Sequence, residues 1–311
     1  MWKSILGGEE MNSNQWVNIV EVGPRDGLQN EKQSISFEDK IELIQRLDRA
    51  GLNYLESGSF VSPKWVPQMA STEEIFNYLK EHGTSNKTYA ALVPNLKGLE
   101  RALTTEVKEI AVFIAASESF SKKNINKSID EAVATTREVI EEAQKHNIKV
   151  RGYLSCVLGC PYEEQVDTKT VVQLTKQLID LGAYEVSLGD TIGVGTPFKT
   201  RELLRALKEE VPVSKLAGHF HDTYGQALAN VWVSLEEGVR TFDSSVAGLG
   251  GCPYAKGASG NLSTEDLIYM LQNSGYETGV DLQKLIETGD FINSVLGRET
   301  NSKVAKGLAK N

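Results

Sequence analysis

The 311-residue chain is poor in cysteine, in positive charge and in long apolar segments. Three cysteines are too few for a disulfide framework and favour a reducing compartment. Lys and Arg total 33 against 42 acidic residues, so the chain lacks the basic surface that non-specific nucleic-acid binding needs. Its longest unbroken apolar run, residues 110–116, is far shorter than the roughly 20 residues of a membrane span. We therefore expect a cytoplasmic protein with neither nucleic acid nor a membrane among its partners.

The N-terminal segment has neither the apolar stretch of a secretory signal nor the arginines of a mitochondrial transit peptide. We interpret residues 1–15 as a disordered lead. The remainder, residues 16–311, is expected to form one domain because no linker or low-complexity segment interrupts it.

Short apolar runs rich in Val, Ile, Tyr and Phe recur along this domain and predict β-strands. Most are continuously apolar rather than alternating, which is typical of strands in a parallel sheet that is buried on both faces. Eight such strands are expected, at residues 16–22, 53–57, 88–93, 109–115, 149–155, 184–188, 215–220 and 241–246.

Amphipathic helices are predicted between the strands. Residues 128–146 place apolar side chains at three- and four-residue spacing, and Ser128 with Glu131 forms a capping box at the start. Residues 36–50 and 167–181 follow the same pattern and are closed by Gly51 and Gly182. Two more helices are expected at residues 263–272 and 282–296.

The alternation of strands and helices predicts an α/β fold. Eight strand–helix units favour a (β/α)₈ TIM barrel, with an extra C-terminal helical segment from about residue 280. A doubly wound open sheet is the structural alternative, and periodicity alone does not separate the two.

Polar residues gather where the predicted strands end, which is where a barrel carries its chemistry. Arg25 and Asp26 follow the first strand, in a tight Gly-Pro turn. Arg151, Tyr153 and Ser155 alternate along the fifth strand and so share one face. The other ends contribute Glu56, Asp190, His219, His221 and Cys252.

Two of the four histidines, His219 and His221, are separated by one residue on a strand, so both imidazoles face the same side. This spacing can present two nitrogen ligands to a metal, with oxygen ligands from Asp26 and Asn261. Such a mixed set suits Mg²⁺ or Mn²⁺ better than structural zinc. The alternative is a histidine pair satisfied by neighbouring carboxylates.

Two further features have a structural and a functional interpretation. Cys252 lies in a glycine-rich loop and is either a catalytic acid or a small apolar residue in a turn. Arg25 and Asp26 are either an active-site pair or a structural ion pair at the barrel mouth. Residue chemistry alone therefore indicates a metal-dependent barrel enzyme of unspecified reaction.

Motifs along the chain narrow this further. The segments VGPRDGLQNE (22–31) and VAGLGGCPYAKGASGN (246–261) resemble signatures of the 3-hydroxy-3-methylglutaryl-CoA lyase family. The resemblance runs from about residue 16 to about residue 306. The cysteine loop is highly specific, whereas the Arg-Asp-Gly element also occurs in related barrel metallolyases and acyl-CoA synthases. Other matching segments are SFVSPKWVPQM (59–69), NLKG (95–98), KKNIN (122–126), GCPYE (159–163), SLGDTIGVGTP (187–197) and HDTYGQALAN (221–230).

The resemblance implies a (β/α)₈ barrel that uses a divalent cation, Mg²⁺ or Mn²⁺, to cleave 3-hydroxy-3-methylglutaryl-CoA into acetyl-CoA and acetoacetate, commonly in leucine degradation. It also implies a homodimer. The implied metal ligands are Asp26, His219, His221 and Asn261, and the implied catalytic residues are Arg25, Asp26, Glu56, Asp190, His219 and Cys252. Substrate contacts are expected from Arg25, Gln29, Arg151 and Tyr153.

An acyl-CoA substrate carries phosphates, so a net-acidic protein needs a local basic patch. The candidates are Lys64, Lys97, Lys122 and Lys123, each of which is otherwise an ordinary surface lysine. Three alternatives remain: a related synthase of the 2-isopropylmalate or homocitrate type, a non-catalytic acyl-CoA binder, and a lyase for a longer 3-hydroxy-3-methylglutaryl-like thioester, which would share all these residues. The Gly-Gly-Cys-Pro-Tyr loop argues against a synthase, which needs no thiol acid there.

Overall fold

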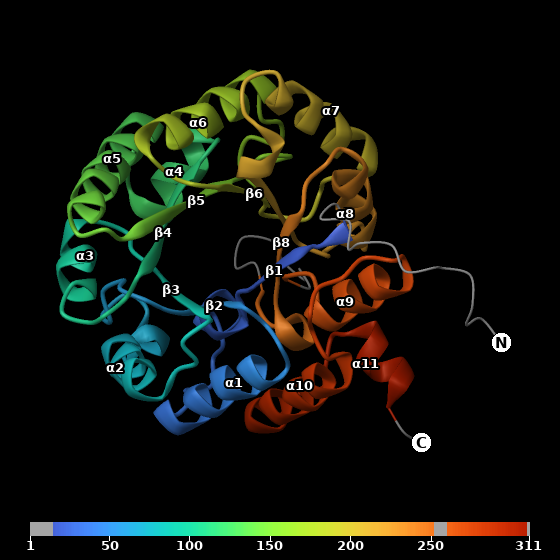
Figure 1. The fold of residues 1–311 in the computed structure, drawn as a ribbon. Helices are drawn as coiled ribbons and strands as arrows, with labels where there is room; N and C mark the ends of the chain where they lie inside the picture. Colours follow the sequence, from blue (N-terminus) through green and yellow to red (C-terminus); the bar gives the residue numbers. More distant parts are fainter. Residues whose placement is uncertain (1–14, 252–259, 310–311) are drawn as a thin grey trace.

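The computed structural model describes residues 15–251 and 260–309. Its eight strands pair in chain order, every pair is parallel, and β8 returns to β1 to close the sheet. Figure 1 looks along the barrel, with the helices in a ring outside the strands. The predicted (β/α)₈ barrel is confirmed, and the open-sheet alternative is wrong because β1 and β8 are hydrogen-bonded to each other.

The strands lie close to the predicted segments. The largest difference is β6, which begins and ends two residues later than predicted because Gly189 and Asp190 pair with β7. Neither residue type favours a strand, so the apolar pattern did not include them. The strands are β1 (Asn18–Glu21), β2 (Tyr54–Ser59), β3 (Thr88–Leu92), β4 (Glu109–Ala115), β5 (Lys149–Ser155), β6 (Val186–Asp190), β7 (Leu216–Phe220) and β8 (Thr241–Ser244).

The helices begin and end at the predicted signals. Ser128 and Glu131 form the capping box of α5, and Gly182 ends α6 with a positive φ of 115°. The helices are α1 (Phe37–Arg49), α2 (Thr72–His82), α3 (Leu96–Ala102), α4 (Glu118–Ile125), α5 (Ile129–Lys145), α6 (Thr168–Leu181), α7 (Pro197–Lys208), α8 (Ala227–Glu236), α9 (Thr264–Asn273), α10 (Leu282–Leu296) and α11 (Lys303–Leu308).

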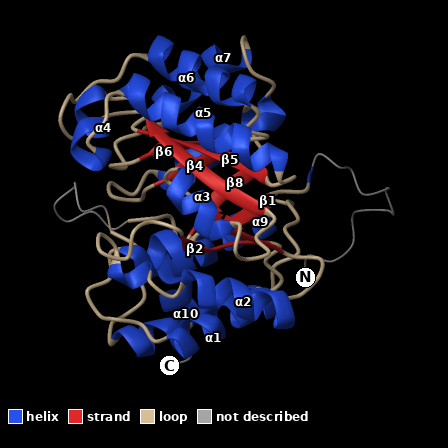
Figure 2. Ribbon diagram, turned by 90° about the vertical axis from the view of Figure 1, so that its left-hand side faces the viewer, coloured by secondary structure: helices blue, strands red, loops and turns tan. Residues whose placement is uncertain are grey.

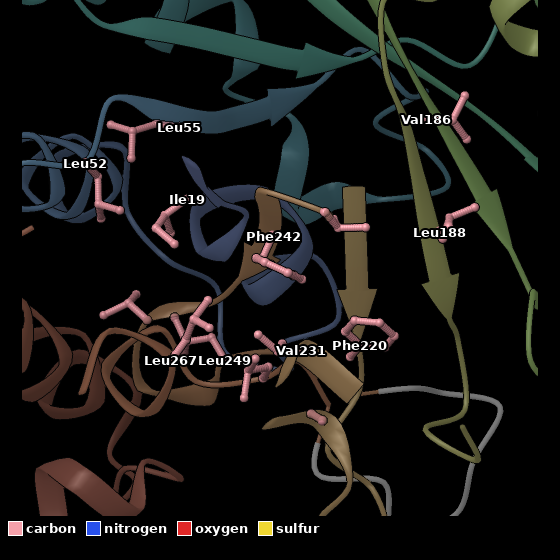
Figure 3. Packing of buried hydrophobic residues seen from close by; sticks show 14 of the residues in the cluster. Ile19, Leu52, Leu55, Val186, Leu188, Phe220, Val231, Phe242, Leu249 and Leu267 are labelled. Carbon is pink, nitrogen blue, oxygen red and sulfur yellow. The ribbon is translucent and has the colours of Figure 1, made fainter. Parts of the chain in front are cut away.

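The main hydrophobic core lies between the strands and the surrounding helices. Leu55, Phe242 and Leu267 are fully buried and come from β2, β8 and α9 (Figure 3). Each such side chain contributes roughly 1.5–3 kcal/mol relative to an exposed one. Figure 2 shows the strands inside and the helices outside them. This packing makes a rigid frame for the side chains that point into the barrel.

The last two helices extend the ring of barrel helices. Helix α10 packs against α1 and α9, and α11 packs against α9 (Figure 1). Within residues 15–251 and 260–309, no helix combines the length and the apolar character that crossing a membrane requires.

Candidate active site

A cavity of about 830 Å³ is lined by residues from the carboxyl ends of the strands, where barrel enzymes carry their active sites. Most of the residues that the sequence pointed to reach this cavity. They are Arg25, Asp26, Gln29, Tyr153, His219, His221 and Asn261.

Arg25 is held firmly at the cavity wall. It lies in a π-helical turn, Gly23–Gly27, directly after β1, and is 6% exposed. Its Nε donates to Glu56 Oε2 at 2.7 Å, and its Nη1 donates to Asp26 Oδ1 at 2.5 Å. These two carboxylates hold the guanidinium from two sides. The Arg25 side chain therefore cannot rotate freely, and its remaining N–H groups keep a fixed direction.

Asp26, His219 and His221 form one cluster. One ligand atom from each lies within 4.8 Å of the others, and the two histidine Nε2 atoms are 3.3 Å apart. Asn261 joins them, since its Nδ2 donates to Asp26 Oδ2 at 2.9 Å and to the Leu249 carbonyl at 3.2 Å. With its nitrogen occupied, the amide oxygen is the atom of Asn261 that can bind a cation.

Two members of this cluster, Asp26 and His221, have charge states that suit a divalent cation; in the third, His219, burial works to lower the pKa, but Asp243 outweighs it and raises this pKa. Burial alone would raise the pKa of Asp26, but Arg25 and His219 outweigh it and lower this pKa to about 2. Burial, reinforced by His219, lowers the pKa of His221 to about 4. At neutral pH Asp26 is therefore a carboxylate and His221 a neutral imidazole, the forms that bind metal. Two imidazoles with carboxylate and amide oxygens fit a hard or borderline cation.

Comparisons with known proteins identify the family of the chain. A family model described as HMGL-like matches residues 16–292. The chain belongs to the HMGL-like family. It is 57% identical over 298 residues to the 3-hydroxy-3-isohexenylglutaryl-CoA/hydroxy-methylglutaryl-CoA lyase of Pseudomonas aeruginosa, covering 96% of this chain and 99% of that one. It is 55% identical over 294 residues to human mitochondrial hydroxymethylglutaryl-CoA lyase, covering 94% and 90%.

Solved structures of the HMGL-like family superpose closely on the chain. A crystal structure of hydroxymethylglutaryl-CoA lyase from Pseudomonas aeruginosa has a TM-score of 0.92 at 57% identity, covering 94% of this chain and 97% of that one. An HMG-CoA lyase from Acinetobacter baumannii, solved with coenzyme A and 3-methylmalate, has a TM-score of 0.91 at 34% identity, covering 97% and 98%. The family resemblance noted in the sequence is thereby confirmed.

The fifth strand divides its polar residues between two depths of this HMGL-like barrel. Tyr153 lines the cavity and donates its hydroxyl to Glu56 Oε2 at 3.2 Å. Arg151 is fully buried below it and bonds to Asp243 and Glu185. The sequence placed Arg151 among the substrate contacts, but its side chain does not line the cavity. Arg151 and Tyr153 do lie on the same face of β5, as predicted. How deep each side chain lies in the barrel depends on the register of the strand, which the alternation of residues does not specify.

Asp190 is bonded to the backbone of the loop that follows β6. This carboxylate is completely buried and accepts hydrogen bonds from the backbone N–H groups of Val194 and Gly195 at 3.1 and 2.9 Å. Burial raises its pKa to about 6, against the lowering effect of those N–H groups. The structure therefore places Asp190 beneath the loop that follows β6.

Asp243 is a site residue that the sequence reasoning missed. It lies on β8, is 2% exposed, and its Oδ2 is 3.0 Å from His219 Nδ1. The signal in the sequence was a single carboxylate inside an otherwise apolar and hydroxylated strand. A charge in such a position needs a partner inside the barrel.

The basic residues at the cavity differ from those expected. Lys123 lines it, whereas Lys64, Lys97 and Lys122 are exposed and do not. Lys127 also lines the cavity and was missed, although it directly follows the KKNIN segment.

The cysteines have different positions relative to the described residues. Cys252 lies outside them, so its expected role as an acid remains a prediction. Cys156 and Cys160 are buried, and Cys160 Sγ is 2.9 Å from Ser117 Oγ. Both thiols therefore pack inside the fold, and neither lines the cavity.

Proposed function

We propose that the chain is a divalent-cation-dependent lyase that cleaves 3-hydroxy-3-methylglutaryl-CoA into acetyl-CoA and acetoacetate. The observation that carries this proposal is the position of Arg25 next to the Asp26, His219 and His221 cluster in one cavity. Curated lyases that are 55–57% identical over more than nine-tenths of the chain support the same reaction.

The cation is proposed to be Mg²⁺ or Mn²⁺, held by Asp26, His219, His221 and Asn261. When bound, it supplies Lewis acidity that lowers the pKa of the substrate's C3 hydroxyl. The carboxylate of Asp26 and the amide oxygen of Asn261 are the donors in this set that suit Mg²⁺ or Mn²⁺.

Deprotonation of the C3 hydroxyl starts the bond cleavage. Asp26 and His219 both line the cavity, and either is a candidate base. The alkoxide collapses to the ketone of acetoacetate, the C2–C3 bond breaks, and its electron pair becomes the enolate of the acetyl thioester. Cleavage thus gives acetoacetate and the enolate of acetyl-CoA, and C2 of this enolate must still gain one proton.

Arg25 stabilises the negative charge that develops on the thioester oxygen. Its guanidinium is already oriented by Glu56 and Asp26, so little reorganisation is needed during the reaction. Tyr153 supports the same arrangement through Glu56. We assign Glu56 to positioning Arg25, and Asp190 to holding the neighbouring loop.

The proton for C2 is assigned to the Cys252 thiol, on the family resemblance. Gln29 and Tyr153 line the cavity and are proposed to contact the acyl part of the substrate. Lys123 and Lys127 are placed to pair with phosphates of coenzyme A. We further propose that the protein is a homodimer and that it is cytoplasmic. Light scattering on the purified protein checks the oligomeric state.

The test is acetoacetate release from 3-hydroxy-3-methylglutaryl-CoA, measured with Mg²⁺, with Mn²⁺ and with a chelator. Cation-dependent release is expected from the wild type, and Cys252→Ala is expected to bind the cation but lose most turnover. Folded, cation-loaded wild type that releases no acetoacetate would overturn the proposal and direct attention to condensation of acetyl-CoA with 2-oxo acids. Near-full activity of Cys252→Ala would remove the thiol from the mechanism.

A further inference from the structure

Asp243 connects the expected cation site to a buried charge network below it. Its carboxylate lies 3.0 Å from His219 Nδ1 and accepts a hydrogen bond from Ser187 Oγ at 2.7 Å. Arg151 donates to both of its oxygens, at 3.1 and 2.7 Å. The side chains of Asp243 and Arg151 are completely shielded from solvent. This carboxylate therefore has no contact with water and acts only through its protein neighbours.

The hydrogen bonds determine which nitrogen of His219 carries a proton. A guanidinium is always a donor, and the two bonds from Arg151 keep Asp243 ionised and able only to accept. The contact with His219 therefore requires a hydrogen on Nδ1. In the neutral imidazole Nε2 is then left with a free lone pair, and Nε2 is the nitrogen that faces His221, 3.3 Å from its Nε2.

The short distance between His219 and His221 makes the position of the proton on His219 important for cation binding. Their Nε2 atoms are 3.3 Å apart, so a proton on His219 Nε2 could be donated to His221. That hydrogen bond would occupy both ligand nitrogens at once and close the site to a cation. The alternative tautomer thus competes directly with cation binding, and Asp243 is the group that disfavours it.

We propose that Asp243 is a positioning residue that holds His219 in the Nδ1-protonated tautomer, which keeps the Nε2 of His219 available to the cation. The inference rests on the proposed function in one respect, which is that the cation bound at His219 is the one that the lyase reaction requires. Carboxylates that orient a ligating imidazole in this way typically change metal affinity by 10–100-fold when removed.

Glu185 supplies a matched control. Its Oε1 accepts from Arg151 Nε at 2.7 Å, so it pairs with the same guanidinium as Asp243. Its described hydrogen bonds do not include His219. Replacing Glu185 therefore removes one carboxylate partner of Arg151 without touching the imidazole.

The experiment compares Asp243→Asn with Glu185→Gln in cation-free protein. Mn²⁺ titration followed by electron paramagnetic resonance should give a Kd about 10–100-fold weaker for Asp243→Asn. Glu185→Gln should stay within about threefold of the wild type. The side-chain amide of Asn replaces one of the two acceptor oxygens by a donor, which opposes Ser187 and His219 at the Oδ2 position or Arg151 Nη2 at the Oδ1 position. In either orientation the negative charge that favours a proton on His219 Nδ1 is lost, which is why the near-isosteric change is expected to act.

Nitrogen-15 imidazole spectra give a second readout that a purely structural role would not move. Only four histidines need assignment. Wild type and Glu185→Gln should show His219 protonated at Nδ1, and Asp243→Asn should show a new population protonated at Nε2. If Asp243→Asn does not fold, Asp243→Asn/Arg151→Met removes the unpaired buried charge and is measured in the same way.

Unchanged Mn²⁺ affinity and tautomer in Asp243→Asn would overturn the proposal, as would an equal loss of affinity in Glu185→Gln. Failure of the lyase reaction is a separate result. A wild type that releases no acetoacetate but shows these Mn²⁺ and tautomer differences would refute the proposed substrate and leave the role of Asp243 standing.

Discussion

Glu21 Oε1 accepts the backbone N–H of Val246 at 2.9 Å, across the junction where the barrel closes. The same oxygen accepts the Gly23 N–H at 2.8 Å, at the start of the turn that carries Arg25 and Asp26. A single buried carboxyl thus joins the turn after β1 to the segment after β8. Glu265 repeats the arrangement, since both of its oxygens lie 2.9 Å from the Ala247 nitrogen.

These two acids predict how stability depends on pH. Burial raises the pKa of Glu21 to about 8 and that of Glu265 to about 7, from 4.5 in the unfolded chain. The folded protein then holds protons that the unfolded chain has released, so their contribution to the free energy of unfolding falls as pH rises from about 4.5 to 8. Urea unfolding at pH 5, 6, 7 and 8 should show this fall. Glu21→Gln should flatten it, whereas the exposed Glu287→Gln should not.

Helix α10 contains a glycine that its neighbour requires. A Cβ at Gly289 would lie 2.6 Å from Glu265 Oε1, whereas a Cβ at Gly307 in α11 would have no neighbour within 4 Å. Gly→Ala inside a helix normally stabilises by about 0.5–1 kcal/mol. We expect Gly307→Ala to raise Tm and Gly289→Ala to lower it, measured by calorimetry. A rise in both would show that the Glu265 carboxyl moves without cost.

Arg25→Lys should reduce kcat by about 100–1000-fold, the range found when a preorganised oxyanion donor is removed. A lysine has one charged point and cannot keep the bonds to both Glu56 and Asp26 while directing a further donor at the substrate. Steady-state kinetics with saturating cation provide the measurement. Arg46→Lys, in a half-exposed helical pair with Glu42, is the control and should leave kcat unchanged.

Lys127→Ala should raise KM for the acyl-CoA severalfold and leave kcat nearly unchanged, because Lys127 lines the cavity but is not a member of the cation cluster. Lys97→Ala removes an equal charge from an exposed lysine that does not line the cavity. The difference between the two should shrink as salt is added, since ionic screening weakens contacts with phosphates. Equal KM values in the two variants would place the phosphates elsewhere.

The sequence predicted most of the barrel because each strand and helix has a local signal, such as the capping box at Ser128. It also predicted which side chains gather at the cavity, because strand ends converge in this architecture. Depth inside the barrel was not predictable in the same way. Arg151 and Tyr153 share a face, yet the register of β5 places only Tyr153 at the cavity. Asp243 was missed because a lone acid in a strand gives no indication of its partner, which lies on the neighbouring strand β7.

The closure of the barrel also sets an order for biosynthesis. Asp26 meets Asn261 across 235 positions of the chain, and Arg298 bonds to Glu31 across 267. Asn301 and Lys303 then bond to Gly248 and to Asp222, which follows His221. A nascent chain that has only its first strands therefore cannot form a working site, because Asp26 must meet Asn261, which is synthesised much later. Contacts of such long range also slow folding, so we expect this barrel to fold more slowly than a protein of similar size whose contacts are mostly local.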